Sequence, residues 1–226
     1  MATPLYYAAL CGFHDLTEQL IIKHRQQVNA AGGYYVSPLA AALSSGHIKV
    51  AQLLYERGAD VDVRNHYNHT PLHGASSSGQ LEIVQWPLSR SANPNVVDGN
   101  GRTPLHSAAC FGYAEISRLS LHYKADIYAR DNDGWTPLLE AVQHMRLNLV
   151  RLLLEHGADV NARDNSHNTS LHLVSNRGRL EVARLLVEHG ADIDAEDQEG
   201  RTAFQLASEK GHHDIAKLLS DHHGSK

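Results

Sequence analysis

Residues 147–162 read LNLVRLLLEHGADVNA, and residues 180–195 read LEVARLLVEHGADIDA. The two stretches begin 33 residues apart and share a leucine pair, a His-Gly step and an Ala-Asp turn. A period of about 20–50 residues is the signature of a stacked repeat protein. We therefore expect one elongated body, because each copy can bury its apolar face only against its neighbours.

A short motif repeats at the same interval along the rest of the chain. Its six copies are Ser37-Pro38-Leu39, Thr70-Pro71-Leu72, Thr103-Pro104-Leu105, Thr136-Pro137-Leu138, Thr169-Ser170-Leu171 and Thr202-Ala203-Phe204, and a seventh, Thr3-Pro4-Leu5, lies 34 residues before Ser37. The motif predicts a single solenoid over residues 1–226. Its seven repeats cover about 1–35, 36–68, 69–101, 102–134, 135–167, 168–200 and 201–226, with the first and last as caps.

Each copy carries the signals of two helices separated by a tight turn. Thr103 can cap a helix with its hydroxyl, and Pro104 suits the first helical position, where no N–H partner is needed. Gly112 is placed to end this short helix in a left-handed conformation. A second helix follows with apolar Ile116 and Leu119, and the Asp- and Gly-rich segment 131–134 is typical of a turn.

Turn, short helix, turn and longer helix at a period of 33 resemble the ankyrin repeat. The matching motifs are Thr70-Pro71-Leu72-His73, Thr103-Pro104-Leu105-His106 and Gly157-Ala158-Asp159-Val160. The resemblance implies an all-α fold, an α-solenoid of helix-turn-helix units with β-hairpin-like loops. It also implies a concave face made by those loops and the first helices. In the family, the histidine of the motif helps to tie neighbouring loops together.

Composition and charge narrow the classes of partner. The net charge is −5, the pI is about 6.4 and no run of five or more Lys and Arg is present, which disfavours nucleic acid. No apolar run of 18 residues suggests a membrane span. Cys11 and Cys110 lie three repeats apart, too far for a disulfide, and two unpaired thiols favour a reducing compartment. We expect a monomer in the cytoplasm, with the nucleus as a further location.

The start of the chain enters the first repeat directly. Met1 to Pro4 show no basic-then-apolar signal segment. Both a complete protein and a fragment of a longer one fit this start.

Signals for chemistry are weak. The chain has 17 histidines, but His73, His106 and His172 belong to the repeat motif. The adjacent pair His212 and His213 points in different directions on a helix and makes a poor chelate. No Cys/His spacing of a zinc site and no Gly-rich phosphate loop are present, so we expect no metal site, no cofactor and no enzyme activity.

The positions that differ between copies predict the contact surface. In this family, partners contact mainly the hairpin tips and the exposed end of the first helix. Tyr, Trp and Arg dominate binding hot spots because they bury a large area and keep a polar group. The predicted partner-binding residues are Tyr34, Tyr35, His66, Tyr67, His69, Asn100, Arg102, Phe111, Tyr113, Asn132, Asp133, Trp135 and His144. The alternative is that loop aromatics such as Tyr67 and Trp135 pack on the next loop.

The function predicted is that of a protein-binding module or scaffold, recognising a partner protein or peptide on the concave loop and first-helix face. One alternative is the recognition arm of a larger regulatory protein, such as a ubiquitin-ligase adaptor or a receptor. Another is a free-standing chaperone similar in build to gankyrin. The resemblance also implies a modification site, because some family members are hydroxylated at the asparagine of the Asp-Val-Asn turn, which here is Asn161.

Two second helices break the leucine pattern. The third repeat has Trp86-Pro87 and the fourth Leu119-Ser120 where other copies have Leu-Leu. A proline inside a helix removes a hydrogen bond and clashes with an earlier carbonyl. Either the helix at Pro87 ends early and its neighbours absorb the gap, or the two repeats form a weak seam that acts as a hinge.

Overall fold

The computed structural model describes residues 2–23 and 27–223, and over these residues it is all-helical. The chain separates into two compact units, which are described one at a time. Unit 1 comprises Met1–Pro104 with His122–Ala125, and unit 2 comprises Leu105–Leu121 with Asp126–Lys226. The boundary falls inside the fourth predicted repeat, so the single body predicted from the period remains a prediction.

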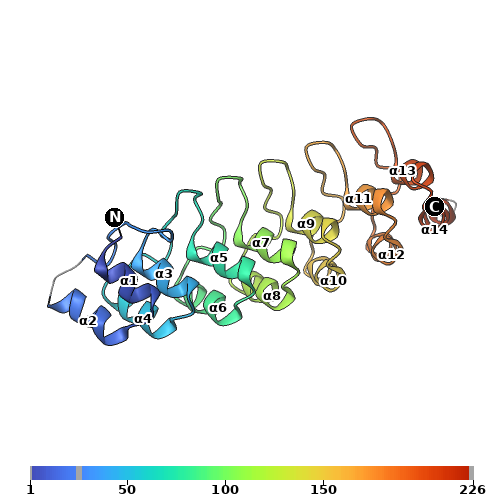
Figure 1. Ribbon diagram of the computed structural model, residues 1–226. Coiled ribbons are helices and arrows are strands. Elements are labelled where there is room, and N and C mark those ends of the chain that lie inside the picture. The colour runs from blue at the N-terminus through green and yellow to red at the C-terminus, as the bar shows by residue number, and fades with distance from the viewer. Residues whose placement is uncertain (1, 24–26, 224–226) are drawn as a thin grey trace. The chain divides into compact units, whose positions relative to one another are not determined.

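The helices alternate between a short first helix and a second helix of nine or more residues in each repeat (Figure 1). In unit 1 they are α1 (Pro4–Leu10), α2 (His14–Ile22), α3 (Pro38–Ser44), α4 (Ile48–Glu56), α5 (Pro71–Ser78) and α6 (Leu81–Ser89). In unit 2 they are α7 (Pro104–Phe111), α8 (Ala114–His122), α9 (Pro137–Gln143), α10 (Leu147–Glu155), α11 (Ser170–Arg177), α12 (Leu180–Glu188), α13 (Ala203–Glu209) and α14 (His213–His223), apart from the first residue of α7 and the last of α8, which group with unit 1.

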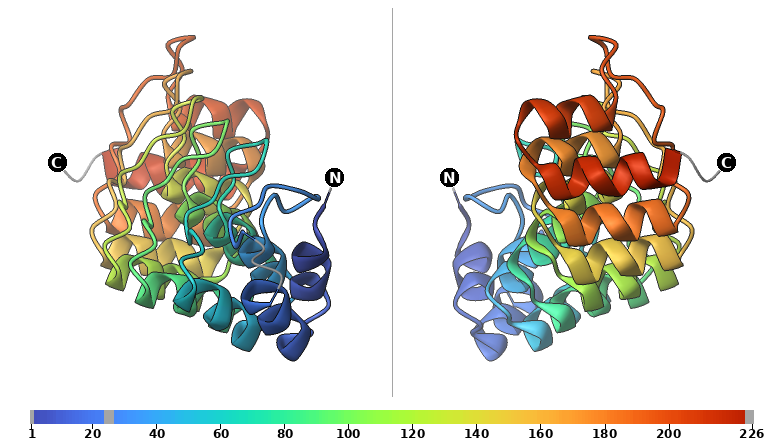
Figure 2. Two further views of the ribbon diagram at one scale, coloured as in Figure 1. Left: turned by 90° about the vertical axis from the view of Figure 1, so that its left-hand side faces the viewer. Right: turned by 90° about the vertical axis from the view of Figure 1, so that its right-hand side faces the viewer.

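The repeated motif starts the first helices as predicted. The Thr3 hydroxyl accepts a hydrogen bond from the Tyr6 N–H, and Ser37 does the same for Ala40. Proline follows each of these caps at a position that needs no N–H partner. Within each unit the second helices lie alongside the first, and successive helix pairs stack, with α3 between α1 and α5 in unit 1 and α11 between α9 and α13 in unit 2 (Figure 2).

Each unit has a core of small and branched apolar residues. In unit 1, Leu5, Leu39 and Leu54 are fully buried. In unit 2, one continuous cluster runs from Ala109 to Leu219. Alanines at the pairing faces of the first helices let the helices approach closely, which is why the short helices are held although they are too short to be stable alone.

Long loops join one repeat to the next on the same side of the helix pairs within each unit (Figure 1). Two of the loops in unit 2 close with an antiparallel bridge, Arg163 to Thr169 and Glu196 to Thr202. These bridges are the β-hairpin-like feature that the family resemblance implied. Within the described part of the chain, no helix is both long and apolar enough to cross a lipid bilayer.

Pro87 does not shorten its helix. α6 runs from Leu81 to Ser89, as long as the other inner second helices, so the prediction of an early end is wrong. Pro87 lies in the last turn of α6, and its carbonyl accepts hydrogen bonds from the N–H groups of Arg90 and Ala92, which close the end of the helix. The hinge hypothesis remains a prediction.

Candidate functional site

The loop tips are held by buried aspartates. Asp98 is 8% exposed, and its Oδ1 accepts hydrogen bonds from the backbone N–H of Asn100 (2.8 Å) and Arg102 (2.9 Å). Asp164 serves the N–H of Ser166 and Asn168 in the same way. Aspartate side chains that bond two and four residues ahead are turn chemistry, so the sequence itself fixes the shape of these loops.

His73, in the first turn of α5, links this helix to the loop of the next repeat. Its Nδ1 accepts from the Thr70 N–H at 3.1 Å, which caps α5, and its Nε2 donates to the Arg102 carbonyl at 3.0 Å. Burial lowers the pKa of His73 from 6.5 to about 4, so the ring is neutral at physiological pH. His172 repeats the arrangement with Thr169 and the carbonyl of Arg201, and burial lowers its pKa also.

Two adjacent tyrosines, Tyr34 and Tyr35, in the loop that precedes α3 have different surroundings. Tyr34 is 76% exposed, whereas Tyr35 is half-buried and its N–H donates to the Tyr6 hydroxyl at 3.3 Å. The two rings meet edge to face with centroids 5.0 Å apart. The Tyr34 ring is therefore exposed to solvent, and it rests against the half-buried Tyr35, which is held by Tyr6.

The loop that precedes α5 carries an exposed tyrosine, Tyr67, next to a polar cluster of His69, His73 and Asp98. Tyr67 is 69% exposed, and its carbonyl accepts a hydrogen bond from the N–H of Gly99 in the next loop. His69 is half-buried, stacks on His73 with centroids 5.4 Å apart and places Nε2 3.1 Å from Asp98 Oδ2. Tyr67 thus offers its ring to solvent while its backbone ties two loops together.

The other predicted partner-binding residues of unit 1 are likewise either exposed to solvent or half-buried and bonded within the loops. His66 and Asn100 are exposed at the tips of neighbouring loops. Arg102 is half-buried, and its carbonyl accepts from His73.

In unit 2 the predicted residues are more mixed. Phe111 is 49% exposed and stacks against the half-buried Tyr113 at 6.1 Å. Trp135 is half-buried; its carbonyl accepts from His106 Nε2 at 3.0 Å. His144 is exposed at the end of α9.

Asn132 and Asp133 are exposed at the loop tip that precedes α9. Their carbonyls accept hydrogen bonds from Asn165 at the next tip, both at 2.9 Å. The backbone of this tip therefore braces its neighbour, while the two side chains face solvent.

Comparison with known proteins identifies the repeat. Models of ankyrin repeats match residues 39–88, 72–164 and 163–226, which together make up well over half of the chain. The chain is an ankyrin-repeat protein. A solved structure with a similar fold is the ankyrin repeat domain of Bcl-3, described as a unique member of the IkappaB protein family. It has 28% sequence identity and a TM-score of 0.87, over 96% of this chain and 98% of that chain. A search of curated protein sequences returned no match.

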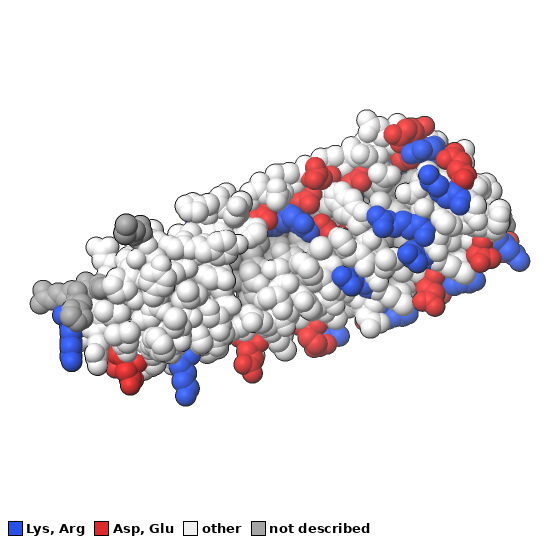
Figure 3. Space-filling view, viewed as in Figure 1, with Lys and Arg blue, Asp and Glu red and all other residues white. Residues whose placement is uncertain are grey.

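Ankyrin repeats are generally protein–protein interaction modules, and this supports the general part of the predicted function, the binding of a protein. Charge is distributed unevenly over this ankyrin chain. Residues 1–104 hold 14 of the 45 Asp, Glu, Lys and Arg residues, and residues 105–226 hold the other 31. Figure 3 shows this uneven distribution on one face. The surface of unit 1 has few charged side chains there, and the surface of unit 2 has many, both acidic and basic.

Asn161 lies in a ladder of side chains that links the ankyrin loops. Its amide Nδ2 donates to the Gly190 carbonyl at 3.3 Å, and its Oδ1 accepts from the Asp192 N–H at 2.7 Å. Tyr128 takes the equivalent place one repeat earlier, and its hydroxyl donates to the Gly157 carbonyl at 3.0 Å. Asn161 is exposed, and its hydroxylation stays a prediction.

Sequence reasoning missed two features of the surface. Tyr7 and Phe13 are each 57% exposed in the first repeat, although the predicted contact zone begins in the second. The structure also brings Cys110, Glu140 and His144 together. These three residues are separated by 30 and 34 positions rather than 33, so a search along the repeat register does not pair them.

Proposed function

We propose that the chain is a protein-binding module whose principal contact surface lies on the loop tips of unit 1, with Tyr34 and Tyr67 at its centre. The observation that carries this proposal is the exposure of these two tyrosines, 76% and 69%, on successive loops that are otherwise hydrogen-bonded in place. Exposed tyrosines of this kind bury a large area on binding and lose little conformational freedom.

The loops favour binding because they are already ordered. Asn65 Oδ1 accepts from the N–H groups of Tyr67 (2.9 Å) and His69 (3.0 Å), and the Gly99 N–H holds the same loop from the next repeat. A partner would therefore lose little free energy to ordering the loop on docking.

The sparse charge of unit 1 indicates the chemistry of the partner. A surface of tyrosine, histidine and asparagine with few formal charges suits an apolar patch rimmed by hydrogen-bonding groups. It gives little electrostatic attraction to a strongly charged ligand, which agrees with the prediction of a protein rather than a nucleic acid partner.

The test is affinity purification from the native cell with four proteins. These are the wild type, Tyr34→Ala, Tyr67→Ala and the control Phe13→Ala, which removes an aromatic side chain of similar exposure from the turn between α1 and α2. We expect a partner that is retained by the wild type and the control and lost by both tyrosine variants. A partner retained equally by all four proteins, or lost only with Phe13→Ala, would refute the assignment of the surface.

A further inference from the structure

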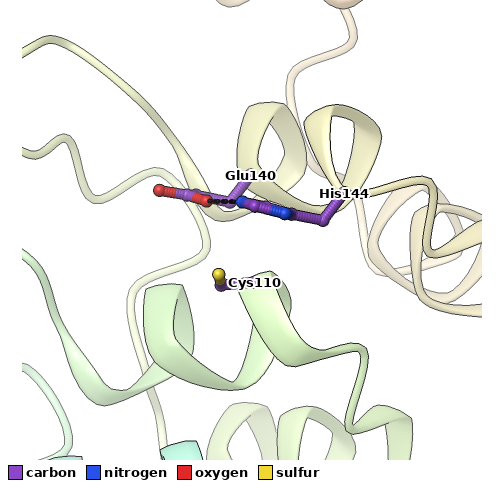
Figure 4. Close-up of side chains that lie close together, drawn as sticks. All are labelled: Cys110, Glu140 and His144. Atoms are coloured by element: carbon purple, nitrogen blue, oxygen red, sulfur yellow. Dashed lines mark ion pairs between the residues drawn. The ribbon is translucent and has the colours of Figure 1, made fainter.

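We propose that Cys110, Glu140 and His144 form a binding site for a zinc ion. Cys110 lies near the end of α7, Glu140 lies on α9 of the next repeat, and His144 is the residue that follows the end of α9. Each side chain offers one ligand atom, and the three atoms all lie within 4.8 Å of one another. Figure 4 shows the sulfur of Cys110 directed from α7 toward the Glu140–His144 pair above it.

The two helices supply this arrangement through their spacing. Glu140 and the C-cap residue His144 are four residues apart, so their side chains lie on the same side of the end of α9, and His144 Nε2 lies 3.4 Å from Glu140 Oε2. α7 and α9 are the first helices of adjacent repeats. Cys110 in the last turn of α7 therefore faces the end of α9.

Burial leaves the site open on one side. The Glu140 side chain is only 9% exposed, and Cys110 is partly buried, whereas the His144 side chain is 43% exposed. A metal ion here would be bound by Glu140 and Cys110 on its buried side and would be open to solvent on the side of His144.

The chemistry of the three groups selects zinc. Thiolate sulfur, imidazole nitrogen and carboxylate oxygen are the ligands of Zn²⁺, and three of them with one open position is a known coordination pattern. Mg²⁺ and Ca²⁺ prefer oxygen ligands throughout, so a cysteine and a histidine disfavour them. The Cys110 thiol would release its proton to solvent as the sulfur–zinc bond forms, and a water molecule would fill the fourth position.

The fit requires a small adjustment of side chains. Zinc–ligand bonds of about 2.0–2.3 Å place tetrahedral ligand atoms roughly 3.3–3.8 Å apart. The 3.4 Å between Glu140 Oε2 and His144 Nε2 already fits this range, and the Cys110 sulfur, within 4.8 Å of both, has to approach by at most about 1–1.5 Å. The partly buried Cys110 and the exposed His144 are the two groups with room to adjust.

The repeat scaffold itself does not require these residues. The position of Glu140 is occupied by Ala41, Gly74 and Leu173 in other copies. Ser44 and Ser77 stand at the position of Cys110, and Ser45 and Ser78 stand at that of His144. The three ligands are therefore particular to the fourth and fifth repeats, and variants drawn from the other copies are compatible with the fold.

The experiment uses the full, reduced and metal-free chain, with cobalt(II) as a coloured substitute for zinc. The proteins are the wild type, Cys110→Ser, His144→Ser and the control Cys11→Ser. Cys11 lies one residue beyond the register of Cys110 in the first repeat, at the end of α1, and Ala41 and Ser45 stand where Glu140 and His144 would be. Circular dichroism verifies that each variant is folded.

We expect the absorption that arises from thiolate-to-cobalt charge transfer in the wild type and in Cys11→Ser, and its displacement by zinc. Cys110→Ser should lack the band, and His144→Ser should bind at least about tenfold more weakly, since even changes outside the ligand set produce losses of that size. Zinc should also slow alkylation of Cys110 by iodoacetamide while Cys11 in the same molecule reacts as before.

Three results would overturn the proposal. The first is the absence of the thiolate band in the wild type at excess cobalt. The second is a band of equal strength in Cys110→Ser, or its loss in Cys11→Ser. The third is zinc binding of equal affinity in the wild type and in both ligand variants, which would assign the metal to exposed histidines elsewhere in the chain.

Discussion

Replacement of His73 by glutamine should change how the stability of the protein depends on pH. His73 is 1% exposed, and burial lowers its pKa from 6.5 to about 4. Between these two values the unfolded chain binds a proton at this histidine and the folded chain does not. The free energy of unfolding therefore falls as the pH drops through this window, and its contribution is fully present above the unfolded value.

The size of the effect follows from the shift. A single histidine with these two pKa values loses about 2.5 kcal/mol of stabilisation between about pH 7.5 and about pH 4.5. His172 adds to the loss in the same direction, because burial lowers its pKa also.

Glutamine is the matched replacement because the chain already uses it at this position. In the last repeat, Gln205 Oε1 accepts from the Thr202 N–H at 2.8 Å, as His73 Nδ1 accepts from the Thr70 N–H. His73→Gln should keep the cap of α5 and lose the bond to the Arg102 carbonyl. It should therefore be about 1 kcal/mol less stable than the wild type at neutral pH.

The assay is urea unfolding followed by the fluorescence of Trp86, which lies in the same repeat, in a background that carries Trp135→Phe. The wild type and His73→Gln should exchange their order of stability as the pH falls, with the variant about 1.5 kcal/mol more stable at about pH 4.5. Parallel curves for the two proteins over this range would refute the assignment of a neutral, buried His73.

Three further predictions concern single groups. Ser120 is 1% exposed, and within the described residues its hydroxyl has no hydrogen-bond partner, so Ser120→Ala should raise the free energy of unfolding by about 1 kcal/mol; a loss in chemical denaturation would show that the hydroxyl is bonded. Asp164→Ala should lower it by about 1–3 kcal/mol, because the N–H groups of Ser166 and Asn168 lose their acceptor, and an unchanged midpoint would contradict the role of this aspartate in shaping the loop. If Pro87 and Ser120 form a weak seam, hydrogen exchange of α6 and α8 should be faster than that of α12 and α14, whereas uniform protection would end the hinge hypothesis.

The sequence was sufficient to predict the fold because the copies repeat the same signals for the start and end of each helix. The Thr-Pro-Leu-His motif begins the first helices, its histidine ties neighbouring loops as the family resemblance implied, and Gly112 ends α7 with a φ of +84°. Of the two alternatives for Pro87, the early end of its helix is wrong. Pro87 removes one regular hydrogen bond, yet α6 continues to Ser89 and the buried ring packs in the core.

The site was less predictable than the fold because exposure depends on packing between repeats. Tyr34 and Tyr35 are neighbours of the same type, yet Tyr34 is 76% exposed and Tyr35 is half-buried, with its backbone N–H bonded to the Tyr6 hydroxyl. Tyr128 resembles a contact residue by its 59% exposure, but its hydroxyl bonds to the next loop. The approach of Cys110 to Glu140 and His144 depends on how two helices stack, which a period of 33 does not specify.

The most direct test of the contact surface is photo-cross-linking in the native cell. A photoreactive phenylalanine analogue is placed at position 67 in one protein and at position 13 in another, since both native side chains are exposed aromatics of unit 1. We predict that irradiation joins the chain to a partner protein from position 67 and not from position 13. An adduct from position 13 alone would contradict the proposal that the loop tips of unit 1 bind the partner.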